Sequence, residues 1–226
     1  VKVRATNANY EPATCDYTLE VTCAPVTVKA ATQTFTYDGA THSDATYTVT
    51  GLVGTDAISA TITGSIQFVS QSPVTNVVSS YTFTAGDANN YCVTTENGEL
   101  KMIYGTCQDL LITADSQTWT YDGATHTQDS YTLTIGSGSP IAVGADGVYT
   151  FANGDKLTVV VDGSVKNYTA TGVANAVTSY TIMNGTQDVS AAYCVTTTDG
   201  VLKINKRPVV ITADDNAKMY DGTPLT

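Results

Sequence analysis

The chain has 226 residues and a formal net charge of −11, with 10 Lys and Arg against 21 Asp and Glu. This acidity argues against binding to nucleic acid, which needs a basic face to neutralise phosphates, and against docking on anionic lipid. No run approaches the ~20 apolar residues of a membrane-spanning helix, and charged residues are only 14% of the chain. A composition rich in Thr, Ser, Gly and Tyr favours a secreted protein, with no membrane insertion in this segment.

Residues 1–25 are predicted to be the end of a preceding repeat. Val1 to Arg4 already has the pattern of a strand, with no signal peptide before it. Tyr17 to Val21 continues with alternating residues. We therefore expect the sequence to be an excerpt from a longer polypeptide.

Two related modules follow, which we place at residues 26–107 and 108–206. Both contain the phrase Thr-aromatic-Thr-Tyr-Asp-Gly-Ala-Thr-His, and both close on Tyr-Cys-Val-Thr-Thr followed by Gly-x-Leu-Lys. A phrase that returns in this way indicates duplicated structural units. The two copies of its central tripeptide are Tyr37-Asp38-Gly39 and Tyr121-Asp122-Gly123.

The second module is longer than the first. Tyr131 and Gly163 lie 32 positions apart, whereas the equivalent Tyr47 and Gly64 lie 17 apart, a difference of 15 residues. We place this insertion within 136–156, where Asp-Gly and Asn-Gly turn signals predict an added hairpin or a long loop.

Residues 207–226 are predicted to begin a following repeat. Val210 to Asp214 resembles Leu111 to Asp115, and a third copy of the tripeptide stands at Tyr220-Asp221-Gly222. The chain is thus expected to contain a part-repeat, two whole repeats and a second part-repeat.

The periodicity within each repeat is two, with Thr on the polar side of most runs, which is typical of strands. The Asn97-Gly98 and Asp199-Gly200 pairs predict that the final two strands of each repeat form a hairpin. We expect an all-β protein with little or no helix, built as an elongated tandem array of small modules that are β-grasp-like or Ig-like sandwiches. Small-angle scattering checks that arrangement, because a tandem array should scatter as a rod and not as a compact globule.

The Tyr-Asp-Gly tripeptide is predicted to be a structural turn at a hairpin corner. Asp bonds its own backbone two residues on, Gly accepts a positive φ, and Tyr buries its ring while its hydroxyl stays at the edge. No catalytic role is assigned to any of its three copies.

His42 and His126 occupy the same place in the two modules, which invites a metal site. Leu225 stands at that place in the third copy, so packing is the preferred interpretation, and no metal or cofactor is predicted. The segments 87–90 and 153–155 resemble calcium-loop fragments but lack the spacing of a calcium loop. No nucleophile, base and His come together as catalysis would require, and no enzyme is predicted.

Phe35 and Trp119 are equivalent, and Lys218 replaces them in the third copy. Because Lys is rarely buried, this position is expected on a rim. Two interpretations stay open for Phe35 and Trp119: an aromatic that covers the junction between modules, or a ligand-binding residue that stacks on a sugar or a partner protein.

The five cysteines leave an odd thiol. A hairpin that turns at Asn97-Gly98 and a chain that folds back at Gly105 would bring Cys92 to Cys107, within the ~7 Å that a disulfide allows between Cα atoms. The alternative is that the thiols are buried as small hydrophobic side chains.

The repeat pattern resembles the YDG/MBG-type repeats of bacterial secreted and cell-surface proteins. It is carried by Ile211 to Thr226, Tyr47 to Gly51, Asn90-Tyr91 and Gly200 to Ile204. The resemblance implies non-catalytic, strand-rich, adhesin-like modules on the bacterial surface. The expected roles are stalk and adhesion, with neighbouring repeats and a host glycan or protein as partners. The alternative is a carbohydrate-binding module that uses Trp119 and the 136–156 loop.

Overall fold

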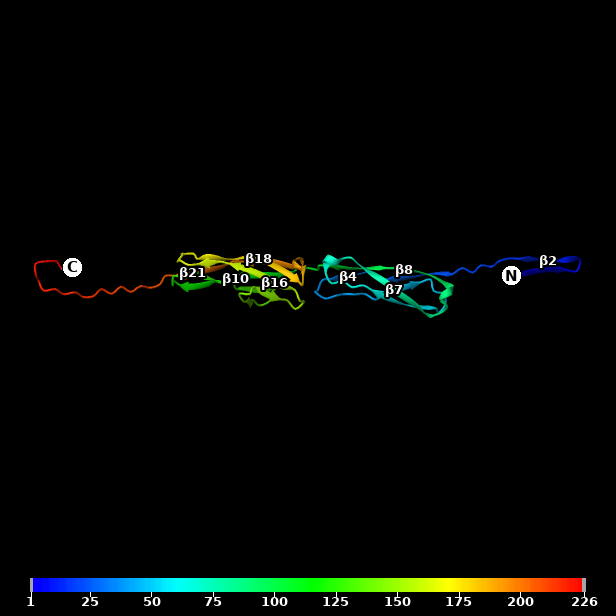
Figure 1. The fold of residues 1–226 in the computed structure, drawn as a ribbon, viewed down its shortest axis with the longest axis horizontal. Coiled ribbons are helices and arrows are strands. Elements are labelled where there is room, and N and C mark those ends of the chain that lie inside the picture. Colours follow the sequence, from blue (N-terminus) through cyan, green and yellow to red (C-terminus); the bar gives the residue numbers. More distant parts are fainter. Residues whose placement is uncertain (1, 225–226) are drawn as a thin grey trace. The chain divides into compact units, whose positions relative to one another are not determined.

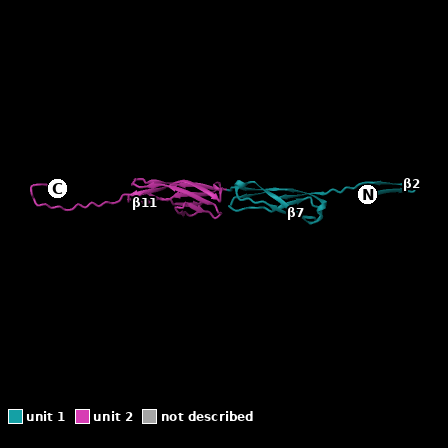
Figure 2. Cartoon of the chain, viewed as in Figure 1, with its two compact units in different colours: residues 1–105 teal, residues 106–226 magenta. Residues whose placement is uncertain are grey.

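The computed structural model describes residues 2–224, and the chain forms two compact units, Val1–Gly105 and Thr106–Thr226 (Figure 2). Among the described residues, the only helical segments are single 3-10 turns, so the protein is all-β as predicted. The three turns are η1 (Val69–Gln71), η2 (Ala88–Asn90) and η3 (Ser190–Ala192). No helix among residues 2–224 has the length and apolarity needed to cross a bilayer.

Unit 1 contains an exposed hairpin and two sheets (Figure 1). The hairpin pairs β1 (Lys2–Asn7) with β2 (Tyr10–Asp16). The first sheet has the order β5-β3-β8 and the second the order β4-β9-β7-β6. Their bounds are β3 (Ala24–Ala30), β4 (Gln33–Thr36), β5 (Tyr47–Thr50), β6 (Ala57–Thr63), β7 (Val74–Ala85), β8 (Tyr91–Glu96) and β9 (Gly98–Ile103).

Unit 2 repeats this plan with additional strands. One sheet has the order β14-β13-β10-β20; the other has the order β11-β21-β18-β16-β15, with β19 beside β18; and β12 pairs with β17. The bounds are β10 (Gln108–Ala114), β11 (Gln117–Thr120), β12 (His126–Thr127), β13 (Tyr131–Ile135), β14 (Ile141–Val143), β15 (Val148–Thr150), β16 (Lys156–Asp162), β17 (Ser164–Val165), β18 (Val173–Asn184), β19 (Gln187–Asp188), β20 (Tyr193–Thr198) and β21 (Gly200–Asn205).

The 136–156 insertion forms strands that join both sheets. β14 pairs with β13, and β15 pairs with β16. β15 and β16 form an antiparallel hairpin whose turn contains Asn153-Gly154, one of the predicted turn signals, and β14 forms a second hairpin with β13. The insertion widens two existing sheets by one strand each.

In each unit the opening and closing strands run side by side in the same direction. The parallel register runs from Ala24 opposite Tyr91 in β3 and β8 to Thr36 opposite Ile103 in β4 and β9. In unit 2 the same arrangement joins β10 and β11 to β20 and β21. β9 runs on from β8 in the same direction and does not pair with it, so the predicted hairpin at Asn97-Gly98 is wrong. The predicted hairpin at Asp199-Gly200 is wrong for the same reason.

Gly98 and Gly200 are glycines because another backbone segment leaves no room for a side chain. A Cβ on Gly98 would lie 2.0 Å from the Ala31 carbonyl oxygen, and one on Gly200 would lie 2.4 Å from that of Asp115. Neither glycine has a positive φ. The preceding Asn97 and Asp199 side chains accept hydrogen bonds from the backbone N–H groups of Val78 and Val177, at 3.0 and 3.1 Å. The Asn-Gly and Asp-Gly pairs thus mark a close approach of two strands, where the sequence pattern predicted a turn.

We expect Gly200→Ala to destabilise unit 2 by about 3 kcal/mol, because the new methyl group can be accommodated only if two backbone segments separate. Gly144→Ala is the matched control, since a Cβ there meets nothing closer than 3.8 Å and its φ is not positive. Urea denaturation of both variants checks this prediction. Equal midpoints for the two variants would contradict it.

The core of each unit lies between its sheets and follows from the period of two. In unit 1 the alternation of β3 buries Val26 and Val28 against Ile58 and Tyr91. In unit 2 the fully buried residues include Leu110, Ile112, Tyr131, Leu133, Leu157 and Ile182. Each buried side chain of this kind contributes about 1.5–3 kcal/mol, so each unit has an apolar core of its own.

The disulfides differ from the predicted pairing. Cys23 is bonded to Cys92, and Cys107 is bonded to Cys194, whereas Cys15 is exposed and unpaired. The predicted Cys92–Cys107 bridge is therefore wrong. It depended on a hairpin at Asn97-Gly98, and because β9 runs on in the direction of β8, the chain carries Cys107 away from Cys92 and into the next unit.

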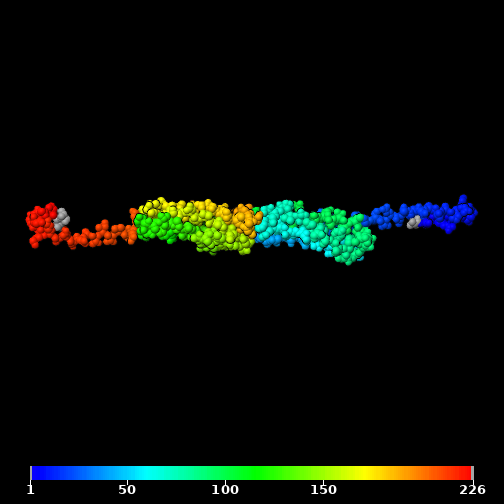
Figure 3. Space-filling view, viewed as in Figure 1, coloured from blue at the N-terminus to red at the C-terminus, as the bar shows by residue number. Residues whose placement is uncertain are grey.

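Residues 2–22 and 206–224 belong to neither core, and they are thin in the space-filling view (Figure 3). Apolar side chains in them are exposed, Leu19 by 72% and Ile211 by 90%. Leu225, which the sequence comparison set against the two histidines, lies outside the described residues.

Candidate functional site

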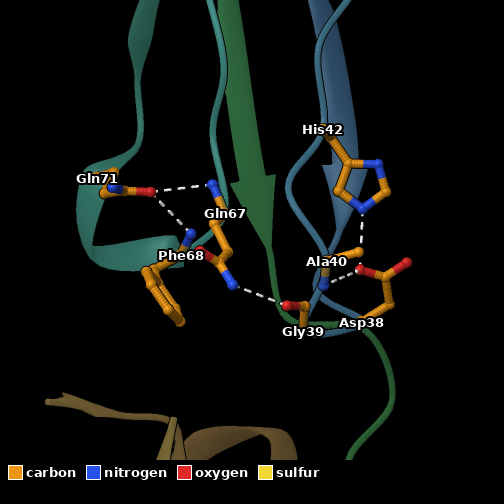
Figure 4. Close-up of polar contacts among 7 residues, drawn as sticks. All are labelled: Asp38, Gly39, Ala40, His42, Gln67, Phe68 and Gln71. Atoms are coloured by element: carbon orange, nitrogen blue, oxygen red, sulfur yellow. Dashed lines mark hydrogen bonds and ion pairs between the residues drawn. The ribbon is translucent and has the colours of Figure 1, made fainter. Parts of the chain in front are cut away.

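The Tyr-Asp-Gly segment forms a tight turn at the end of β4 (Figure 4). The Tyr37 N–H donates to the Ile103 carbonyl at 2.9 Å, and Asp38 Oδ1 accepts the Ala40 N–H at 2.9 Å. Gly39 takes a φ of 84°, which is unfavourable for a residue with a side chain. Its carbonyl accepts a 2.8 Å hydrogen bond from Gln67 Nε2.

The same turn forms in the other two copies. Asp122 Oδ1 accepts the Ala124 N–H at 2.9 Å, and Asp221 Oδ1 accepts the Thr223 N–H at 3.0 Å. The turn does not join an antiparallel pair, because within residues 2–224 the partners of β4 and β11 are the parallel strands β9 and β21. It is a structural turn at the end of a parallel strand and not the corner of a hairpin.

The histidines of this segment are held between an aromatic ring and a carboxylate. His42 stacks on Phe35 with ring centroids 4.8 Å apart, and its Nε2 lies 2.9 Å from Asp38 Oδ1. His126 repeats both contacts, with Trp119 at 4.8 Å and Asp122 at 3.1 Å. The His of Tyr-Asp-Gly-Ala-Thr-His thus ties the turn to the strand before it, which is a packing role.

These contacts act on the acids of the turn. The hydrogen bond to His42, and after it that from the Ala40 N–H, lowers the pKa of Asp38. The Ala124 N–H, and after it His126, lowers the pKa of Asp122. A carboxyl whose pKa is lower in the folded chain stabilises the fold above the unfolded-state pKa, about 3.9 for Asp, and this contribution is lost as the pH falls.

We therefore expect the free energy of unfolding to decline below about pH 4, and to decline less steeply in the double variant Asp38→Asn/Asp122→Asn. The two carboxylates are about half exposed, so the difference is small. Denaturant titrations between pH 2.5 and 7 measure it. Identical pH profiles for the variant and the unaltered chain would count against the coupling.

The aromatic residues at the predicted rim position pack inward. Trp119 is partly buried against Val165, Leu202 and Ile204, and Phe35 packs in the same way in unit 1. In the third copy Lys218 lies 2.9 Å from Asp221 Oδ2. The aromatic side chain and His126 thus close one end of the core.

The contacts of Trp119 lie outside the insertion: its ring packs on Val165, Leu202 and Ile204 and stacks on His126. These contacts give no support to the platform of Trp119 and the 136–156 loop, which the alternative function requires.

We expect Trp119→Ala to destabilise unit 2 by about 2–3 kcal/mol, because it removes a half-buried ring from the end of the core and the stack on His126. Tyr121→Ala is the control, since Tyr121 is 42% exposed, and should cost under about 1 kcal/mol. Thermal unfolding followed by circular dichroism compares them. Equal melting temperatures for the Trp119 variant and the unaltered chain would show that the ring does not support the core.

The acidic clusters use their oxygens within the protein. Asp87 Oδ1 accepts from the backbone N–H and the Nδ2 of Asn89. Asp155 is fully buried, and its oxygens accept from the Asn153 and Asn184 amides at 2.9 and 2.8 Å and from the Tyr193 hydroxyl at 2.8 Å. Burial raises the pKa of Tyr193; the hydrogen bond with Asn153 opposes this shift, and the hydrogen bond and charge of Asp155 add to it. Asp155 therefore secures the insertion to β18 and β20.

Among residues 2–224, one group of three side chains has metal-ligand character, namely Cys107, Asp109 and Cys194. Its two sulfurs are bonded to each other, so neither offers the thiolate that a metal needs. The group therefore belongs to the disulfide.

Sequence inspection missed a pair of equivalent buried asparagines. Asn76 Nδ2 donates to the Ala31 and Asp44 carbonyls at 3.0 and 2.9 Å, and Asn175 Nδ2 donates to those of Asp115 and Gln128, both at 2.8 Å. Both residues are fully buried, and each Oδ1 has no hydrogen-bond partner among the described residues. Their common position, five residues before Tyr81 and Tyr180, was the available signal.

Two comparisons with known proteins bear on this arrangement. Residues 26–101 match the family model described as MBG domain (YGX type). The matched segment runs from β3 to β9 and includes the first Tyr-Asp-Gly turn. No curated protein matches the chain. The resemblance of the repeats to MBG-type modules is thus confirmed for the first unit.

Proposed function

We propose that this chain, which carries an MBG domain of the YGX type at residues 26–101, supplies non-catalytic stalk or adhesion modules to a bacterial surface protein. The single observation that carries the proposal is the family match at residues 26–101. Residues 106–226 contain a similar set of strands, the same turn and an equivalent disulfide, so the module is present twice. A module with its own core can be repeated without loss of stability.

The surface chemistry supports an extracellular setting. Both units contain a disulfide, and disulfides form and persist in oxidising compartments. The net charge of −11 keeps such a chain soluble and repels anionic lipid. The residues placed at the Tyr-Asp-Gly turn make structural contacts with one another, and the family brings no catalytic set to carry over.

The partners proposed are the neighbouring repeats of the same chain and a host glycan or protein. Ligand contact through Trp119 has little support, since its ring contacts the core and His126. Any ligand surface is better sought on the exposed faces of the sheets, where Thr side chains dominate the strands.

The test is made on intact bacteria that produce the protein in which this chain occurs. Antibodies against residues 24–205 are expected to label unpermeabilised cells, and deletion of these residues is expected to reduce attachment to host cells or matrix under flow. A variant in which a flexible Gly-Ser segment of equal length replaces them separates loss of length from loss of a binding surface. Labelling only after permeabilisation would reject the proposal.

A further inference from the structure

The direction of the strands determines how each unit responds to tension. The chain enters the two sheets of unit 1 at Cys23, before β3, and leaves them after β9. The two strand paths between these points lie in parallel register from Ala24 opposite Tyr91 to Thr36 opposite Ile103. Since parallel paths start at the same end of a ladder, the chain enters at one end and leaves at the other. Tension on the two ends therefore loads the hydrogen bonds of the ladder together, in shear.

Unit 2 has the same geometry. Its parallel ladder begins with Gln108 opposite Tyr193 and ends with Thr120 opposite Asn205. Each backbone hydrogen bond contributes only about 0.5–1.5 kcal/mol of net stability. Resistance to pulling comes from loading many of them at once.

Each disulfide lies at the end of the ladder where the chain enters. Cys23 immediately precedes β3, and Cys92 is the second residue of β8, opposite Pro25. Cys107 immediately precedes β10, and Cys194 is the second residue of β20. The covalent bond thus connects the entering chain directly to the start of the closing strand path.

This connection removes most of each unit from the load path. The bridges span sequence separations of 69 and 87 residues, and everything between the paired cysteines lies in a closed loop. The remaining path, from Cys92 through β8 and β9, is already extended at ~3.3 Å per residue, against a maximum of ~3.6 Å. Apart from the β1–β2 hairpin, which lies before Cys23, an oxidised unit therefore has almost no length to release, whether its core is folded or not.

We infer that each unit is a load-bearing element whose disulfide fixes its length in oxidising surroundings, and that reduction converts it into an extensible one. The inference rests on the proposed stalk function for its biological meaning, since only a tethered module bears tension. A dithiol reductant gives two electrons and two protons to each disulfide, which becomes two thiols, while the reductant closes into its own cyclic disulfide.

The length that each unit can release is set by the number of residues between its paired cysteines. Reduction should release about 230–250 Å from unit 1, from 69 residues at ~3.3–3.6 Å each. It should release about 290–310 Å from unit 2, from 87 residues. The two values differ enough to identify the unit that has opened.

The experiment pulls single molecules of the whole chain, tethered at its two ends, with and without a dithiol reductant. Cys15→Ser serves as the common background, because Cys15 is exposed and unpaired and would otherwise exchange with the disulfides. The oxidised chain should show neither long step, and the reduced chain should show both, one near 240 Å and one near 300 Å.

Two variants assign the steps. Under oxidising conditions, Cys23→Ser/Cys92→Ser should show only the shorter step, and Cys107→Ser/Cys194→Ser only the longer one. If either variant fails to fold without its bridge, reduction of the folded wild-type disulfides still tests the inference. Long steps in the oxidised chain, or a reduced chain that extends gradually without force peaks, would overturn it.

The outcome is independent of the test for surface function. Step lengths are a property of this chain alone, so a failure there leaves labelling of intact cells and attachment under flow unaffected. Conversely, a chain that shows both steps but is not exposed on cells would keep the mechanical inference and lose the stalk.

Discussion

Removal of the Cys107–Cys194 bridge by the double substitution Cys107→Ser/Cys194→Ser is expected to lower the free energy of unfolding of unit 2 by about 4 kcal/mol. The bridge closes a loop of 87 residues, and the loss of chain entropy that it imposes on the unfolded state grows with the logarithm of loop length. Measured effects of native disulfides range over about 2–5 kcal/mol, so this loss is a large part of a typical domain's stability.

Tryptophan fluorescence during denaturant unfolding measures this effect on unit 2 alone, because Trp119 is the single tryptophan of the chain. The matched variant Cys23→Ser/Cys92→Ser should leave the fluorescence transition in place while shifting the transition seen by circular dichroism. Cys15→Ser, at an exposed and unpaired residue, should change stability by less than about 0.5 kcal/mol. A fluorescence midpoint that moves equally in both double variants would contradict the assignment of one bridge to each unit.

The second large effect is expected at the buried asparagines. Asn175→Ala should destabilise unit 2 by about 2–5 kcal/mol, because it leaves the carbonyls of Asp115 and Gln128 without their shared donor. Those two carbonyls belong to the connections after β10 and before β13, so one amide holds β18 to both. The effect is read from the same tryptophan transition.

Two further variants separate the lost hydrogen bonds from the lost volume. Asn175→Asp keeps the shape but places oxygen against both carbonyls, so it should be at least as damaging as Asn175→Ala. Asn167→Ala is the control at an exposed asparagine of the same unit and should be neutral within about 0.5 kcal/mol. An Asn175→Asp variant as stable as the unaltered chain would show that the two bonds contribute nothing.

Much of the fold could be predicted from local pattern. The period of two and the Thr-rich runs identified an all-β chain, and the Tyr-Asp-Gly phrase located a turn whose Asp and Gly act as their chemistry predicts. These features depend on residues adjacent in sequence. The match to the MBG family model also depends on local sequence, since it covers one continuous segment, residues 26–101.

The error at Asn97-Gly98 shows where local pattern is insufficient. The pair satisfies the rule for a tight hairpin, but β9 bonds to β4 and β7 and runs on from β8, and Gly98 is needed because Ala31 lies against it. Whether a glycine forms a turn or admits a close neighbour depends on the residue that lies opposite it. For Gly98 that residue is Ala31, which is 67 positions away in sequence. The wrong cysteine pairing followed from this one error.

The sequence by itself determined that this protein is built of strands, that its modules are related, and where each Tyr-Asp-Gly turn lies, because these depend on side-chain alternation and backbone preferences over a few residues. Only the tertiary structure decided that the first and last strands of a unit run parallel, that Cys23 meets Cys92 and Cys107 meets Cys194, and that Asn76 and Asn175 hold strands together. These are pairings between residues 32 to 87 positions apart. They are selected by the burial of a shared core, which no local pattern of this chain encodes.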